Sequence, residues 1–180
     1  MRAHASTGVR RRPRNVIELM TQPAYLSLGS NLGERENNLR AAIDALQATM
    51  RVTAVSSLHE TNPVGVVDQP SFYNLALAIQ TDLDPPSLLT TVKRIEQEIG
   101  RRPTFRWGPR VIDIDLLLYD DLIIDTPQLV IPHPEMTNRA FVLVPLAEVA
   151  EDVIHPVFGL PIGQLRDRVT GLDSVRRVET

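Results

Sequence analysis

The spacing of apolar residues in this chain of 180 residues switches between the pattern of a β-strand and that of an α-helix. Apolar residues three or four positions apart predict helices over residues 34–50 and 85–99. Alternation and β-branched residues predict strands over residues 24–28, 52–58, 73–81 and 111–119. This order of elements is typical of the split βαβ arrangement. We therefore expect an α+β protein, a ferredoxin-like βαββαβ antiparallel sheet with helices packed on one face and a C-terminal extension.

Prolines and glycines indicate where the helices begin and end. Pro85 and Pro86 suit the first turn of the second predicted helix, and Gly100 suits its end. Beyond the fourth strand we expect a hairpin partner at 122–124, a helix at 137–150 and a short helix at 162–169. Pro145 should break or kink the helix at 137–150.

Composition restricts the class of protein. A chain of this length makes about one domain, and we assign residues 21–180 to it. Hydrophobic residues make up 43% and charged residues 23%, which excludes global disorder. The chain has no cysteine, which excludes a disulfide scaffold, a thiolate zinc site and a cysteine nucleophile. Its longest apolar stretches, such as Phe141–Ala147, are too short to span a membrane, which takes about 20 residues.

Charge is distributed unevenly along the chain. Residues 1–20 carry five arginines and one glutamate, whereas the remaining residues carry 14 basic and 21 acidic side chains. We interpret residues 1–20 as a disordered basic extension. Translation from Met20, an organelle transit peptide and a nucleic-acid-binding arm are the alternatives. The acidic remainder argues against a general nucleic-acid-binding protein. Because Lys93 is the only lysine beside 18 arginines, arginine must do most of any polyphosphate binding.

Two aspartates lie inside the apolar fourth strand. Asp113 and Asp115 are two positions apart, so their side chains share one face of the strand, with Cα atoms about 6.5–7 Å apart. Burying two carboxylates side by side is costly unless a cation neutralises them, and Mg²⁺ prefers carboxylate oxygens and substrate phosphates. The loop Arg101–Arg110 just upstream carries four arginines and a tryptophan. Together these features predict a metal site that binds a nucleoside triphosphate, in preference to a solvent-facing strand edge.

Other motifs are less specific. The glycine-rich P-loop sequence is absent, and Gly29–Gly33 is equally an anion-binding turn or a plain strand-to-helix turn. His133 lies between two prolines, a pattern that by itself favours a structural histidine. We interpret His59 and His155 as structural.

Several motifs in the same order resemble one known family. They are Gly29-Ser30-Asn31-Leu32-Gly33, Asp68-Gln69-Pro70, Phe72-Tyr73-Asn74, the run Arg106–Asp115, Pro132-His133 and Asn138-Arg139-Ala140-Phe141. From about residue 24 to residue 156 the chain resembles the 6-hydroxymethyl-7,8-dihydropterin pyrophosphokinases of folate biosynthesis. The resemblance implies a single pyrophosphokinase domain that transfers diphosphate from ATP to the pterin hydroxymethyl group and releases AMP. It also implies two Mg²⁺ ions as cofactors.

The resemblance assigns site residues. It implies catalytic roles for Arg101, Arg110, Asp113, Asp115 and His133, with Asp113 and Asp115 holding both metal ions. It implies ATP-binding roles for Leu89, Glu96, Arg101, Trp107, Arg110, Leu116, His133 and Arg139. It implies pterin-binding roles for Thr61, Asn62, Val64, Phe72, Asn74, Trp107, Asp113 and Phe141. Phe72 and Phe141 would sandwich the pterin ring, and Trp107 would close over the site.

Two other interpretations stay open at this point. Another metal-dependent nucleotidyl or glycosyl transferase would use the two aspartates but leave Phe72, Asn74 and Phe141 without a role. A non-catalytic ferredoxin-like binding module would leave the paired carboxylates without a purpose. We expect a cytoplasmic monomer whose partners are ATP and 6-hydroxymethyl-7,8-dihydropterin, with no nucleic acid and no membrane.

Overall fold

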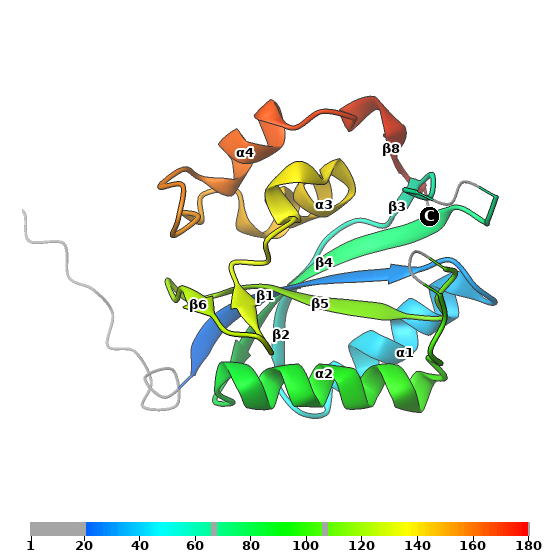
Figure 1. Cartoon of the computed structure of the whole chain (residues 1–180), viewed down its shortest axis with the longest axis horizontal. Coiled ribbons are helices and arrows are strands. Elements are labelled where there is room, and N and C mark those ends of the chain that lie inside the picture. The colour runs from blue at the N-terminus through cyan, green and yellow to red at the C-terminus, as the bar shows by residue number, and fades with distance from the viewer. Residues whose placement is uncertain (1–20, 66–67, 106–107, 180) are drawn as a thin grey trace, which may run out of the picture.

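A computed structural model describes residues 21–65, 68–105 and 108–179, and the predicted extension 1–20 lies outside them. Among these residues, an antiparallel sheet forms the centre of the molecule (Figure 1). Its strands are β1 (Gln22–Ser30), β2 (Arg51–Val55), β3 (His59–Thr61), β4 (Phe72–Thr81), β5 (Asp113–Tyr119) and β8 (Val175–Arg177). The strand order is β5-β1-β4-β3-β8, and β2 also pairs with β4. The predicted combination of helices with an antiparallel sheet is therefore confirmed.

The strand predicted at 52–58 is shorter than expected: β2 ends at Val55, and a separate strand, β3, begins at His59, beyond the predicted range. Both β2 and β3 pair with β4, and between them Ser56 keeps contact with the sheet. The Ser56 amide donates to the Ala76 carbonyl, and the Ser56 hydroxyl accepts from the Ala76 amide, each at 2.9 Å. Glu60 and Thr61, which the sequence places in a loop, belong to β3. The chain leaves the sheet only after Thr61 and returns at Phe72.

The expectation of a hairpin partner for β5 at 122–124 is wrong. Instead β6 (Ile124–Asp125) pairs with β7 (Val130–Ile131) in a separate two-stranded sheet. The reason lies in the turn after β5, where Asp120 has a φ of 47°. Its amide donates to the carbonyl of Pro23 at 2.7 Å, which ties the turn to β1 and directs the chain away from β5.

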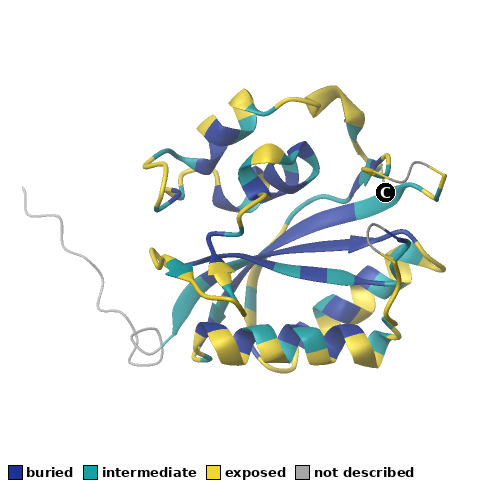
Figure 2. Cartoon of the chain, viewed as in Figure 1, coloured by how far each residue is buried: buried dark blue, intermediate teal, exposed yellow. Residues whose placement is uncertain are grey.

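Helices cover both faces of the sheet, so the expectation that they lie on one face is wrong. On one face α1 (Arg35–Gln47) and α2 (Pro85–Ile99) pack against a core that includes Leu28 and Leu77. On the other face α3 (Ala140–Ala150) and α4 (Ile162–Arg168) enclose a second core around Leu117 (Figures 1 and 2). The sheet has apolar residues on both sides here, and each side is removed from water by its own helix pair.

The predicted boundaries of α2 are confirmed. The Asp84 carboxylate accepts the Ser87 amide at 2.8 Å, Pro85 and Pro86 occupy the first turn, and Gly100 ends the helix with a φ of 112°. In contrast, α3 continues through Pro145 without a break. We attribute this to burial of the apolar residues on both sides of Pro145, which offsets the lost hydrogen bond.

Two short 3₁₀ helices, η2 (Met136–Asn138) and η3 (Leu172–Ser174), complete the described elements. None of the helices in the described ranges combines the length and apolar composition that crossing a membrane needs.

His155 makes stability depend on pH. It is 3% exposed, its Nδ1 accepts the amides of Val157 and Phe158 at 3.3 Å, and burial lowers its pKa. Unfolded histidine takes up a proton near pH 6.5, so the stability that this group contributes above that pH is lost as pH falls through it. His155→Gln keeps an acceptor but cannot titrate. We therefore expect the variant to show a weaker loss of unfolding free energy between about pH 7.5 and about pH 5.5.

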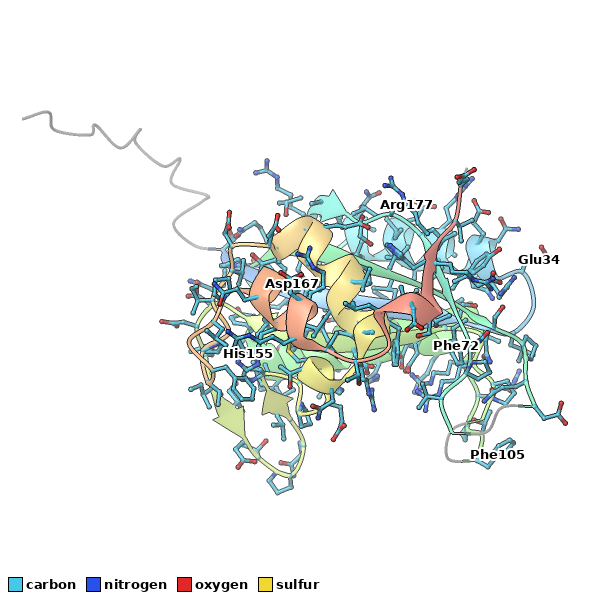
Figure 3. All side chains as sticks on the ribbon, turned by 90° about the horizontal axis from the view of Figure 1, so that it is seen from above. Glu34, Phe72, Phe105, His155, Asp167 and Arg177 are labelled. Atoms are coloured by element: carbon cyan, nitrogen blue, oxygen red, sulfur yellow. The ribbon has the colours of Figure 1, made fainter. Side chains whose placement is uncertain are left out.

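Denaturant unfolding at several pH values measures this difference. His155 and Phe72 lie at opposite ends of the molecule in Figure 3, so the structure around Phe72 should not change in the variant. Equal pH dependence in the two proteins would show that protonation of His155 does not oppose folding.

Candidate active site

The register of three strands brings polar residues together on one face of the sheet. Gly29 of β1 pairs with Asn74 of β4 on one side and with Asp113 of β5 on the other. One row further along, Ser27 pairs with Asp115. Because side chains alternate along a strand, these residues face the same side as α3. The two aspartates, called the acid pair below, therefore lie in adjacent rows at one edge of a polar floor.

A cavity of about 820 Å³ lies over this floor. Its lining comprises Ser27, Gly29, Thr61, Asn62, Val64, Gln69, Phe72, Asn74, Gly108, Arg110, Asp113, Asp115, His133, Pro134, Glu135, Asn138, Arg139 and Phe141. These residues come from the sheet, from the loops after β3, α2 and β7, and from the start of α3. The volume falls within the range typical of small-molecule sites, about 300–1,000 Å³.

Most residues that the sequence predicts for the site line this cavity. They are Thr61, Asn62, Val64, Phe72, Asn74, Arg110, Asp113, Asp115, His133, Arg139 and Phe141. Leu89, Glu96, Arg101 and Leu116 are not among the lining residues, and Trp107 lies outside the described residues. Leu116 and Leu89 pack with the core on the α1 and α2 face. A direct contact of these two leucines with the nucleotide stays a prediction from the resemblance.

At one end of the cavity an amide lies near two aromatic rings. Asn74 is 3% exposed, and its Nδ2 donates to the Thr61 hydroxyl at 2.7 Å. Phe72 of β4 and Phe141 of α3 both line the cavity, and the guanidinium of Arg139 lies 5.8 Å from the centre of the Phe141 ring. A buried amide with adjacent aromatic faces suits a flat heterocycle that carries donors and acceptors on its edge.

Gly29 keeps the floor of the cavity open. A Cβ atom at this position would lie 3.1 Å from the Asn74 side-chain oxygen and 3.7 Å from the Phe72 ring. Glycine is therefore required here because neighbouring side chains leave little room for a Cβ atom, and not because of its backbone conformation. A larger side chain would displace Asn74 or fill the room beside Phe72.

Gly29→Ala should raise the KM for the ligand that binds at the Asn74 and Phe72 end of the cavity by about tenfold. The added methyl group would displace Asn74, and the ligand would lose one to two hydrogen bonds to its amide. The KM for a ligand at the acid-pair end should change by less than about twofold, because the atoms nearest the added Cβ belong to Asn74, Phe72 and Tyr73 and not to the acid pair. Steady-state kinetics with each substrate varied in turn measures both values. A ligand KM equal to that of the wild type would show that Asn74 tolerates the added methyl group.

At the other end of the cavity two arginines contact Asp113, one member of the acid pair. Asp113 accepts a hydrogen bond from Arg101 at 2.5 Å through Oδ1 and another from Arg110 through Oδ2. Burial alone raises the pKa of Asp113, but the charges of Arg110 and Arg101 outweigh burial and lower it below its usual value. Asp113 is therefore held ionised, with cationic groups directly beside it.

Asp115 has a different environment. Among the described residues no hydrogen bond or ion pair reaches its carboxylate. Burial and the negative charge of Asp113 raise the pKa of Asp115, because both disfavour a second charge beside the first. A cation at this position would remove that penalty.

The donors present fit a hard divalent cation. The described residues contain no group of three or more acidic, histidine or cysteine side chains able to hold a metal ion. Mg²⁺ is commonly held by one or two carboxylates together with water and substrate phosphates. The acid pair, unneutralised at Asp115 and open to the cavity, matches that donor set.

Glu96 anchors the arginine side of the site from within the core. It is 2% exposed, and its Oε1 accepts from Lys93 Nζ at 3.0 Å, from Arg101 at 2.5 Å and from the Ile114 amide at 2.6 Å. Burial raises the pKa of Glu96. The carboxylate therefore fixes the end of α2 to β5 and holds Arg101 beside Asp113, behind the cavity and not in its lining.

Asn31 and His133 are placed by contacts that the sequence does not reveal. Asn31 is 1% exposed; its Nδ2 donates to Gln69 and Pro70, and its Oδ1 accepts the Arg110 amide at 2.8 Å. It thus joins the two loops that flank the cavity. The His133 amide donates to the carbonyl of Leu117 at 2.9 Å, which sets this histidine next to β5.

Sequence reasoning did not assign site roles to Ser27, Gly29, Gln69, Gly108, Pro134, Glu135 and Asn138. A signal existed for Ser27 and Gly29, because they alternate along a strand that the fold predicts to be the neighbour of the Asp113 strand. Gln69, Gly108 and Asn138 belong to motifs that carry the resemblance, but these motifs assign them no role. Pro134 and Glu135 follow β7, where no periodicity indicates direction.

Known proteins match this chain over most of its length. Residues 25–151 match the family described as 7,8-dihydro-6-hydroxymethylpterin-pyrophosphokinase. The 2-amino-4-hydroxy-6-hydroxymethyldihydropteridine pyrophosphokinase of Bacillus subtilis is 49% identical over 136 residues, which are 74% of this chain and 81% of that protein. The enzyme of the same name from Aquifex aeolicus is 40% identical over 146 residues, 81% of this chain and 91% of that protein.

Solved structures agree on the fold. The crystal structure of wild-type Plasmodium falciparum HPPK-DHPS aligns with a TM-score of 0.70 at 19% identity. The alignment covers 84% of this chain and 46% of that chain, so this chain spans under half of that longer protein. The match over residues 25–151 includes both the acid pair and the aromatic end of the cavity. The chain belongs to the 7,8-dihydro-6-hydroxymethylpterin-pyrophosphokinase family.

Proposed function

We propose that this chain transfers diphosphate from ATP to the hydroxymethyl group of 6-hydroxymethyl-7,8-dihydropterin, as a step of folate biosynthesis, and releases AMP. One observation carries the proposal: a single cavity joins a carboxylate pair flanked by arginines to an amide flanked by phenylalanines. The first end suits a metal-bound polyphosphate, and the second suits a pterin. The family match supports the same reaction.

The nucleotide end uses charge. Asp113 and Asp115 would hold two Mg²⁺ ions. The positive charge of these ions would lower the activation barrier of diphosphate transfer by offsetting the negative charge that develops on the phosphates. Arg110 and His133 line the same end of the cavity, where they would contact phosphate oxygens. Arg101 is held by Glu96 within reach of Asp113, so a phosphate arriving beside the acid pair meets its guanidinium as well.

The pterin end uses shape and hydrogen bonding. Phe72 and Phe141 would stack on the ring, while the Asn74 amide would pair with its polar edge. This holds the hydroxymethyl oxygen beside the β-phosphorus of ATP. The hydroxymethyl oxygen forms a bond to the β-phosphorus, and its proton is released to solvent. The bond between the β-phosphorus and the oxygen that bridges it to the α-phosphorus breaks, and AMP leaves with that bridging oxygen. Positioning and electrostatic stabilisation supply most of the acceleration.

The other fine details of the prediction belong to this proposal. They are a ferredoxin-like arrangement of β1, α1, β2 with β3, β4, α2 and β5, and a single domain over residues 21–180. We also propose that the protein is a cytoplasmic monomer that binds neither nucleic acid nor membrane. The acidic composition of residues 21–180 supports the part of this proposal that concerns nucleic acid.

Product analysis tests the reaction. AMP should accumulate only when ATP, Mg²⁺ and 6-hydroxymethyl-7,8-dihydropterin are all present, and chelation of Mg²⁺ should stop it. Chromatography of the nucleotides after incubation distinguishes the products. Formation of ADP in place of AMP would contradict diphosphate transfer and favour a different phosphoryl transfer at the same site.

A further inference from the structure

Behind the pterin end of the cavity, a group of charged residues lies on the opposite face of the sheet. Thr61 and Phe72 line the cavity, and their neighbours Glu60 and Tyr73 pair with each other across β3 and β4. Because strand side chains alternate, Glu60 and Tyr73 point to the face that carries α1. Tyr73 accordingly packs with the core on that face.

Arg35, the first residue of α1, joins these neighbours. Its guanidinium lies 3.7 Å from the centre of the Tyr73 ring and donates to Glu60 Oε1 at 3.2 Å. The same nitrogen donates to the carbonyl and the hydroxyl of Ser71, at 2.8 and 2.9 Å. The Ser71 hydroxyl in turn donates to Glu60 Oε1 at 2.7 Å. One arginine therefore connects the residue before Thr61 with the residue before Phe72.

These contacts fix the points where the chain leaves the sheet and returns to it. The chain between Thr61 and Phe72 contributes Asn62, Val64 and Gln69 to the lining of the cavity. Among the described residues, no other side chain of α1 makes a hydrogen bond or ion pair with Glu60 or Ser71. Figure 3 shows Glu34, the residue before Arg35, at the same end of the molecule as Phe72.

The contacts between Arg35, Glu60 and Ser71 are partly buried, so water screens them less than it screens an ion pair on the surface. The side chains of Arg35 and Glu60 are 25% and 29% exposed, and the Ser71 hydrogen bond and the Arg35 charge lower the pKa of Glu60. Glu60 is thus ionised wherever the enzyme is folded near neutral pH. Arg176 of β8 approaches the other carboxylate oxygen at 3.4 Å but is 69% exposed, so it adds little.

We propose that Arg35 is a positioning residue for the pterin: it joins the stems at Glu60 and Ser71 and so sets the placement of Thr61 and Phe72. Arg35 does not line the cavity, and its effect reaches the ligand only through the two strands. The inference rests on the proposed function, since it takes the ligand of this end to be a pterin.

The test compares Arg35→Ala with Arg40→Ala. Arg40 lies on the same helix and pairs with Glu36 at 3.4 Å, but both side chains are more than half exposed. We expect Arg35→Ala to raise the pterin KM by at least about tenfold, with the KM for ATP changed by less than about twofold. Arg40→Ala should leave both values unchanged. Equal losses in both KM values, or a pterin KM like that of Arg40→Ala, would overturn the proposal.

Two further measurements separate positioning from folding. Calorimetric titration of pterin in the presence of Mg²⁺ and a non-hydrolysable ATP analogue should show the same loss of affinity at a temperature where the variant remains fully folded. Arg35→Lys, which keeps the charge, should recover some of that affinity if Arg35→Ala proves unstable. No recovery by lysine in a folded protein would also contradict the proposal.

The same titration on the wild type keeps the two proposals distinguishable. If the wild type binds no pterin and forms no AMP, the proposed function is wrong. If the wild type binds and reacts but Arg35→Ala behaves like Arg40→Ala, only the role of Arg35 is wrong.

Discussion

Asp115→Asn should lower turnover by about 1,000-fold or more, while the free energy of unfolding stays equal to or above that of the wild type. The loss follows from removing one of the two carboxylates that would hold Mg²⁺. The stability follows from burial and the charge of Asp113, which raise the pKa of Asp115 and so disfavour its ionised form in the folded protein. An uncharged amide of the same size is free of both penalties.

Two measurements check this result, namely AMP production and denaturant unfolding in the absence of metal. Asp125→Asn is the matched control, because Asp125 is exposed on β6, outside the cavity lining. It should keep both wild-type turnover and wild-type stability. If Asp115→Asn retained turnover within about tenfold of the wild type, the acid pair would not be the metal site.

Arg110→Ala should lower kcat by about 100- to 1,000-fold and weaken ATP binding by much less. Arg110 lines the cavity and donates to Asp113, so it can move its guanidinium from that carboxylate to the phosphates as charge develops on them. A contact that strengthens only in the transition state acts on kcat and not on ground-state affinity.

Single-turnover kinetics and equilibrium binding of an ATP analogue separate the two effects. Arg94→Ala provides the control, because Arg94 pairs with Glu98 at 2.6 Å on the exposed side of α2. It should match the wild type in both measurements. Equal losses of ATP affinity and kcat/KM with an unchanged chemical step would assign Arg110 to ground-state binding instead.

Local signals in the sequence were sufficient for some of these features. The Asp113 and Asp115 spacing predicts carboxylates on one face, and the strand register confirms that geometry. The ends of α2 follow from Asp84, Pro85 and Gly100, because capping depends on residues within one turn. The pterin-binding and ATP-binding residues came from the resemblance and not from periodicity.

Other features depend on contacts between distant segments of the chain. The division between β2 and β3 depends on how Ser56 pairs with Ala76, 20 residues away. The second helical layer over the sheet depends on where α3 returns after β7, which spacing alone does not specify. Glu96 was predicted to lie near the nucleotide, and only the fold shows that it reaches Arg101 and the Ile114 amide instead of the cavity lining.

Crystallography of the complex with Mn²⁺, a non-hydrolysable ATP analogue and the pterin alcohol tests the central claim most directly. We expect anomalous peaks for two metal ions, each about 2.0–2.3 Å from a carboxylate oxygen of the acid pair, with the triphosphate bound to them. The pterin ring should lie between Phe72 and Phe141. A triphosphate bound away from Asp113 and Asp115, with no metal on either carboxylate, would contradict the account.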